Sequence, residues 1–108
     1  MADLVEELIL DLELDRDEVL RLLRLYLRAC WEDFQAAAGA LDSSQGGMLA
    51  ERAHNIKGAS ANLRIEDARS AAEALEAAGK TGDLSRAPAR LAELRAALNR
   101  VKTEVDAG

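Results

Sequence analysis

The chain has few residues of the kinds that interrupt helices or cross-link a fold. Its 108 residues include one proline, one cysteine, one histidine and three aromatic side chains. A single cysteine, Cys30, excludes an internal disulfide, and its apolar surroundings in the sequence favour a buried small hydrophobe. Alanine, leucine, arginine and glutamate dominate instead, and these residues lose little on entering a helix. We therefore expect an all-α fold.

Long apolar runs are also missing from the chain. None approaches the roughly 20 residues that a helix needs to cross a bilayer. The N-terminal stretch MADLVEELILDLELD is acidic, whereas a signal peptide begins with basic residues. These features predict a cytoplasmic protein that is soluble and has no membrane segment.

Basic residues are outnumbered by acidic ones, 14 to 20, for a net charge of -6. This balance argues against a nucleic-acid-binding protein, which needs a basic face to offset phosphate charge. The imbalance is uneven, because residues 46–64 hold one acid and three bases. We expect a locally positive segment there.

Apolar residues recur at intervals of three and four along most of the chain, as in amphipathic helices. The predicted helices span residues 3–12, 17–41, 47–63, 65–78 and 86–105, with loops at 42–47 and 79–83. This length suits one domain, residues 1–108. The simplest way to bury these stripes is an antiparallel up-and-down four-helix bundle capped by the short first helix. Because the four stripes can close on each other, we expect a monomer.

The only histidine, His54, falls on the outward side of the third predicted helix. At about 100° per residue, it lies about 140° from the direction of Leu49, the first core position. The outward strip around it holds the small residues Gly47, Ala50, Gly58 and Ala61. A glycine within a helix costs about 1 kcal/mol relative to alanine, so Gly58 suggests that a docking partner needs access to the imidazole.

Lys57 adds a cation about one turn from His54 on the same helix. A neutral imidazole next to a lysine suits a nucleophile for phosphoryl groups. An isolated histidine on a solvated helix face is also typical of an ordinary polar surface residue. The rotation of the helix does not separate these two interpretations.

The stretch AHNIKGASANL, residues 53–63, resembles the signature of the histidine-containing phosphotransfer (HPt) domain. The matching residues are Ala53, His54, Ile56, Lys57, Gly58, Ser60, Asn62 and Leu63. The family fold is a four-helix bundle with a short leading helix. The stretch ALEAAGKTGDL, which includes Leu75 and Glu76, also looks like the family's loop after the fourth helix, so the resemblance covers nearly the whole chain.

The resemblance implies that His54 accepts and donates a phosphoryl group, that Lys57 steadies its charge, and that Gly58 allows a partner's close approach. Ser60, Asn62 and Leu63 would be structural members of the motif. The implied docking surface comprises Gly47, Ala50, Glu51, Gly58, Ala61 and Arg64.

The implied partners are receiver domains of a hybrid histidine kinase and of a response regulator. Phosphate would pass between an aspartyl phosphate and His54, with Mg²⁺ held by the receiver and no cofactor in this chain. The sequence has no Walker loop and no glycine-rich nucleotide signature, so we expect a phosphohistidine carrier and not an ATP-dependent enzyme. A receiver-binding adaptor without phosphotransfer chemistry is the alternative. The histidine-bearing helical pair of a sensor kinase fits less well, because HNIKGAS lacks the acidic residue and following proline typical there.

Two positions depart from the family pattern. Arg64 stands where the family usually has glycine, and Ala68 where it often has leucine. Without that glycine, Asn62 is the nearest residue that tolerates a left-handed backbone, or else the two helices join by a different turn. Arg64 would also extend the positive face toward an acidic receiver pocket.

Overall fold

The computed structural model describes residues 3–108, and over that range it contains helices and connecting turns but no strands. The helices are α1 (Leu4–Leu12), α2 (Arg16–Asp42), α3 (Gly46–Asn62), α4 (Glu66–Thr81) and α5 (Ala87–Ala107). They form an elongated body of 42 × 21 × 18 Å. The predicted all-α class is confirmed.

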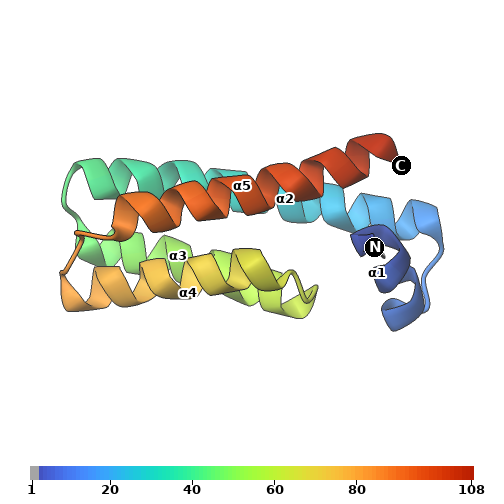
Figure 1. Ribbon diagram of the computed structural model, residues 1–108, viewed down its shortest axis with the longest axis horizontal. Coiled ribbons are helices and arrows are strands. Elements are labelled where there is room, and N and C mark those ends of the chain that lie inside the picture. Colours follow the sequence, from blue (N-terminus) through green and yellow to red (C-terminus); the bar gives the residue numbers. More distant parts are fainter. Residues whose placement is uncertain (1–2) are drawn as a thin grey trace.

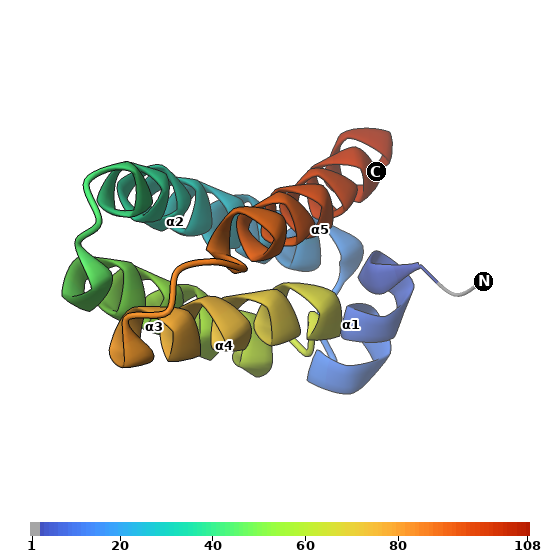
Figure 2. The ribbon, with the colours of Figure 1, turned by 60° about the vertical axis from the view of Figure 1, so that its left-hand side comes forward.

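The four long helices contact each other in a ring. α3 packs against α2 and α4, and α5 packs against α4 and α2. The α2–α3 and α4–α5 connections lie at the same end of the molecule (Figure 1), and α3 and α4 lie side by side in both ribbon views (Figure 2). α1 lies across the other end, where it contacts α2 and α5.

The core is built from the apolar stripes that the sequence predicts. Tyr26, Cys30 and Phe34 of α2 are buried, and Trp31 is half-buried with its ring edge-on to Phe34. Burial raises the pKa of the Cys30 thiol to about 12, so this cysteine stays protonated and acts as a small hydrophobe. The Tyr26 hydroxyl and Ser60 Oγ share a buried hydrogen bond of 2.6 Å, which joins α2 to α3.

The starts of α2 and α5 follow local sequence signals. Asp15 caps α2 by accepting a hydrogen bond from the Glu18 backbone N–H, and the Glu18 side chain accepts one from the Asp15 N–H. Glu13, with φ of 55°, separates α1 from this cap. Pro88 lies in the first turn of α5, where its missing N–H costs nothing.

The helix ends differ from the predicted ones. α2 continues to Asp42 and α3 begins at Gly46, so the loop predicted at 42–47 shrinks to residues 43–45. The prediction of a loop at 79–83 is wrong for its first three residues, because α4 continues through Thr81. Gly82, with φ of 80°, ends α4, a conformation that glycine adopts without strain.

The turn between α3 and α4 is made by Arg64. Its φ is 56°, so the arginine adopts the left-handed conformation that glycine takes most easily. Asn62 is the last helical residue of α3. Of the two alternatives, a left-handed Asn62 is therefore wrong, and the two helices join by a different turn. The turn is still held by backbone hydrogen bonds from Arg64 N–H to Ala61 O and from Ile65 N–H to Ser60 O.

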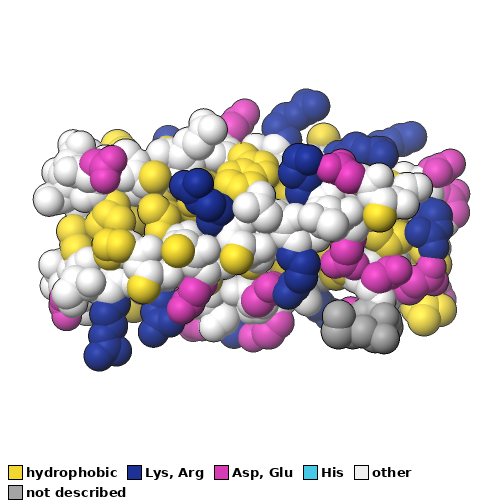
Figure 3. Space-filling view, turned by 45° about the horizontal axis from the view of Figure 1, so that its top comes forward, with side chains coloured by type: hydrophobic (Ala, Val, Ile, Leu, Met, Phe, Trp, Pro, Cys, Tyr) yellow, Lys and Arg dark blue, Asp and Glu magenta, His cyan; other side chains and the backbone are white. Residues whose placement is uncertain are grey.

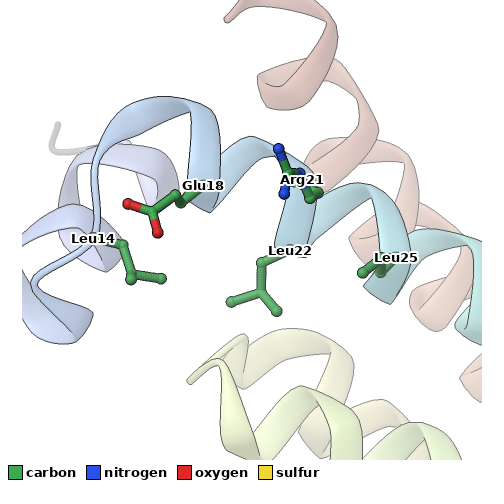
Figure 4. A pocket seen from close by; sticks show the side chains of 5 residues that line it. All are labelled: Leu14, Glu18, Arg21, Leu22 and Leu25. Atoms are coloured by element: carbon green, nitrogen blue, oxygen red, sulfur yellow. The ribbon is translucent and has the colours of Figure 1, made fainter.

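The surface over α5 and its neighbours mixes hydrophobic, basic and acidic side chains, and no histidine is visible on that face (Figure 3). A shallow pocket lies where α1 leads into α2, lined by Leu14, Glu18, Arg21, Leu22 and Leu25 (Figure 4). In residues 3–108 no helix is both long and apolar enough to cross a membrane.

Candidate functional site

His54 lies in the middle of α3 with its side chain 64% exposed. Its Nδ1 is 2.8 Å from Oε2 of Glu76, a residue of the neighbouring helix α4. Within the described chain no hydrogen bond to Nε2 is present. This nitrogen is therefore available to react with a phosphoryl group. The outward position predicted for His54 is confirmed.

Glu76 is a covered carboxylate at the centre of the site, with only 7% of its side chain exposed. Its Oε1 is 2.5 Å from Lys57 Nζ, and its Oε2 faces both His54 Nδ1 and Lys80 Nζ. The hydrogen bond from Lys57, followed by those from His54 and Lys80, lowers the Glu76 pKa to about 2. Glu76 is therefore an anion at neutral pH.

An ionised Glu76 assigns the proton on the imidazole. A carboxylate only accepts hydrogen bonds, so His54 Nδ1 must carry a proton and donate it to Oε2. In a neutral ring the other nitrogen, Nε2, then holds the lone pair. The contact with Glu76 thus sets the tautomer and the orientation of the ring.

The backbones of α3 and α4 approach closely beside this site. A Cβ placed on Gly79 would lie 2.5 Å from Gly46 O and 2.7 Å from Ala50 N. Only glycine fits such a contact, and the contact brings the Glu76 turn of α4 against α3. Ala50 is buried there, with 8% exposure. The prediction that Ala50 lies on the outward strip is therefore wrong, because α4 covers that side of α3.

The other small residues near His54 are open to solvent. A Cβ added to Gly58 or to Gly47 would meet no atom within 4 Å. Gly58, Gly47, Ala61 and Glu51 are all exposed. The absence of a side chain at Gly58 is therefore not needed for packing inside the protein.

The remaining motif residues have structural positions. Ser60 is buried in its hydrogen bond to Tyr26, Leu63 is buried at the end of α3, and Asn62 is exposed. Arg52, on another side of α3, is ion-paired, with its Nη1 3.0 Å from Asp33 Oδ1 of α2.

Arg64 lies ten residues after His54 and beyond the end of α3 at Asn62. Its guanidinium is 3.2 Å from Asp11 of α1. Arg64 thus pairs with α1 from a solvated position, its side chain 77% exposed, and its extension of the positive face toward a receiver stays a prediction.

Glu76 and Lys80 lie at the site through their contacts around Glu76 Oε2, although the sequence analysis assigned neither of them a role. Their spacing of four, Glu before Lys, is a favourable helical ion pair and was visible in the sequence. The link from this pair to His54 was not visible, because it depends on the register of α3 against α4. Across residues 3–108 no group of three or more His, Cys, Asp or Glu side chains could hold a metal ion.

Comparisons with known proteins give the family and the fold of the chain. The family model of the Hpt domain matches residues 21–104. Among solved structures, histidine-containing phosphotransfer protein B from Pseudomonas aeruginosa PAO1 matches with a TM-score of 0.81 and 24% identity, over 95% of this chain and 87% of that one. A comparison with curated protein sequences gives no match. Because the family model covers most of the sequence, including the His54 helix and the Glu76 helix, the chain belongs to the Hpt domain family.

Proposed function

We propose that this protein is a phosphorelay carrier. It accepts a phosphoryl group from an aspartyl phosphate of a hybrid kinase receiver onto His54 Nε2 and passes it to the receiver of a response regulator. The observation that carries the proposal is the hydrogen bond between His54 Nδ1 and the ionised Glu76. This bond leaves a lone pair on Nε2 of a side chain that is largely exposed.

The proposed transfer needs no group that removes a proton from His54. The Nε2 lone pair forms a bond to phosphorus while the bond between phosphorus and the aspartyl oxygen breaks, and the aspartate leaves as a carboxylate. The Nδ1 proton stays in place, so the phosphorylated ring becomes cationic. Glu76 stabilises that cation through its short contact with Nδ1. The reverse reaction delivers the phosphoryl group to the second receiver.

Open space around His54 supports docking of a receiver. Gly58 is one turn after His54 and has no internal packing role. Gly47, Glu51 and Ala61 are exposed nearby, and we propose that they contact the receiver. The receiver supplies Mg²⁺ and the aspartate, whereas this chain supplies the nucleophile and the charges of Lys57 and Glu76. Lys57 acts through Glu76, which it holds ionised.

We also propose that residues 1–108 form one domain that works as a monomer in the cytoplasm. The ring of contacts among α2, α3, α4 and α5, with α1 at one end, supports an antiparallel up-and-down bundle. Size-exclusion chromatography with light scattering tests the monomer.

The direct test replaces His54 by glutamine. A receiver domain carrying radiolabelled aspartyl phosphate should label the wild-type chain, and His54→Gln should remove the label completely. The label should be acid-labile and alkali-stable, as a phosphoramidate is. The matched control is Asn55→Gln, an exposed neighbour that should label normally. An unlabelled wild-type chain that still binds the receiver would instead identify an adaptor without phosphotransfer chemistry.

A further inference from the structure

The two lysines that contact Glu76 differ in how tightly they are held. Lys57 Nζ is 2.5 Å from Oε1 and its side chain is 29% exposed. Lys80 Nζ is 3.3 Å from Oε2 and its side chain is 68% exposed. Lys57 is therefore committed to Glu76, whereas Lys80 makes a longer contact from a solvated position.

Lys80 also shares its acceptor with the imidazole. Glu76 Oε2 accepts from His54 Nδ1 at 2.8 Å and from Lys80 Nζ at 3.3 Å, so the ammonium group lies beside the ring that would be phosphorylated. Lys80 is in the last turn of α4, and its flexible four-carbon stem can re-orient without moving the helix.

We propose that Lys80 is the cation that leaves Glu76 and contacts the phosphoryl oxygens on His54. This inference rests on the proposed function and adds a residue from α4 to it. Before transfer, the positive charges of Lys57 and Lys80 both stabilise the negative charge of Glu76. After transfer, the cationic ring neutralises part of the Glu76 charge at Oε2. At the same time, a phosphoryl group of charge about -1.5 to -2 is present on Nε2. The electrostatic attraction of the Lys80 ammonium group to the phosphoryl oxygens is then stronger than its attraction to Glu76.

The test uses potassium phosphoramidate as a small phosphoryl donor, so that receiver docking plays no part. Lys80→Gln should slow phosphohistidine formation about two- to fivefold, the range expected for one solvent-exposed ion pair. Lys80→Arg should restore most of the rate. High salt should shrink the difference between Lys80→Gln and wild type. The matched control is Lys102→Gln, an exposed lysine of α5 that is ion-paired four residues away, to Asp106.

A second measurement reads the contact directly. In NMR spectra of the phosphorylated chain, the Lys80 ammonium resonance should shift and exchange more slowly with water, while that of Lys57 should change little. Equal rates for Lys80→Gln and Lys102→Gln, together with an unchanged Lys80 resonance, would overturn the role of Lys80 and leave the carrier function standing. A wild-type chain that phosphoramidate and the phosphorylated receiver both fail to label would overturn both proposals.

Discussion

At the scale of single residues, the chemistry of His54 depends on one contact from another helix. In an exposed imidazole without a partner, water can reach both ring nitrogens, and no contact decides which of them carries the proton. The Glu76 carboxylate removes this equivalence, because it is ionised and accepts the proton of Nδ1. In the proposed transfer, Glu76 is thus a positioning residue and Nε2 is the nucleophile.

The tautomer assignment is measurable. Long-range ¹H–¹⁵N NMR correlations at pH 8 should show His54 protonated on Nδ1 in the wild type. Glu76→Ala removes the acceptor, so the ring should populate both tautomers and lose part of its reactivity toward phosphoramidate. Glu73→Ala is a suitable control, since this exposed glutamate pairs with Arg69 instead. A wild-type ring protonated on Nε2 would contradict the assignment.

Glu76 should also make stability depend on acid. Its pKa falls from 4.5 in the unfolded chain to about 2 in the folded one, mainly because of the hydrogen bond from Lys57. A depressed folded pKa gives stability that is complete above the unfolded pKa and is lost as pH falls toward 2. Urea unfolding at pH 7, 4 and 3 should show this loss in the wild type and a smaller loss in Glu76→Gln. An identical pH dependence in the two proteins would refute this linkage.

At the scale of helices, α3 and α4 are positioned by glycines with opposite roles. Gly46 and Gly79 let the two backbones touch, and a side chain at either would collide with the other helix. Gly58 and Gly39 have open space where a Cβ would be. The same residue type therefore serves packing at one pair of positions and leaves free surface at the other.

This contrast gives a set of matched alanine variants. Gly58→Ala and Gly39→Ala should each raise the free energy of unfolding, by up to about 1 kcal/mol, because alanine favours the helix and meets no neighbour. Gly58→Ala alone should slow transfer from a phosphorylated receiver, while uptake from phosphoramidate should stay normal. Transfer from the receiver at the wild-type rate would show that Gly58 is not at the interface.

The third member of the set is Gly79→Ala. Its methyl group would lie within 3 Å of backbone atoms of Gly46 and Ala50, so α3 and α4 must move apart. We expect a loss of stability and a weakened contact between His54 and Glu76. Thermal unfolding and the His54 tautomer report the two effects. An unfolding temperature equal to that of the wild type would show that the interface adapts freely.

The sequence predicts most of these helices but not the contacts between them. Periodicity finds each helix because the apolar stripes are continuous. The prediction that Ala50 faces outward assumed that α3 has one buried direction. In the structure α3 contacts both α2 and α4, so a wider arc of its surface is buried. The last turn of α4 was missed for a related reason. Gly79 and Lys80 are typical of turns in the local sequence, but Gly79 packs closely against Gly46 of α3, and this contact is compatible with a helix.

At the scale of the whole molecule, the two ends of the body have different tasks. One end holds the α2–α3 and α4–α5 connections. At the other, α1 is tied to α5 by the hydrogen bond from Leu4 N–H to Glu104 Oε1 and to the α3–α4 turn by the Arg64–Asp11 ion pair. His54 lies between them on α3. The closing contacts of α1 are therefore separated from the proposed phosphoryl site, and changes in these contacts should leave transfer unaffected.

Arg64→Gly tests this separation. Glycine relieves the cost of a left-handed arginine, about 1–2 kcal/mol, but it loses more backbone entropy on folding and gives up an exposed ion pair worth at most about 1 kcal/mol. The net change in the free energy of urea unfolding should therefore stay within about 1 kcal/mol. Labelling of His54 by a phosphorylated receiver should match the wild type, because Arg64 lies beyond the end of α3 and its guanidinium pairs with Asp11 of α1. Slower labelling, with stability unchanged, would place Arg64 in the docking surface after all and extend that surface to the α1 end of the molecule.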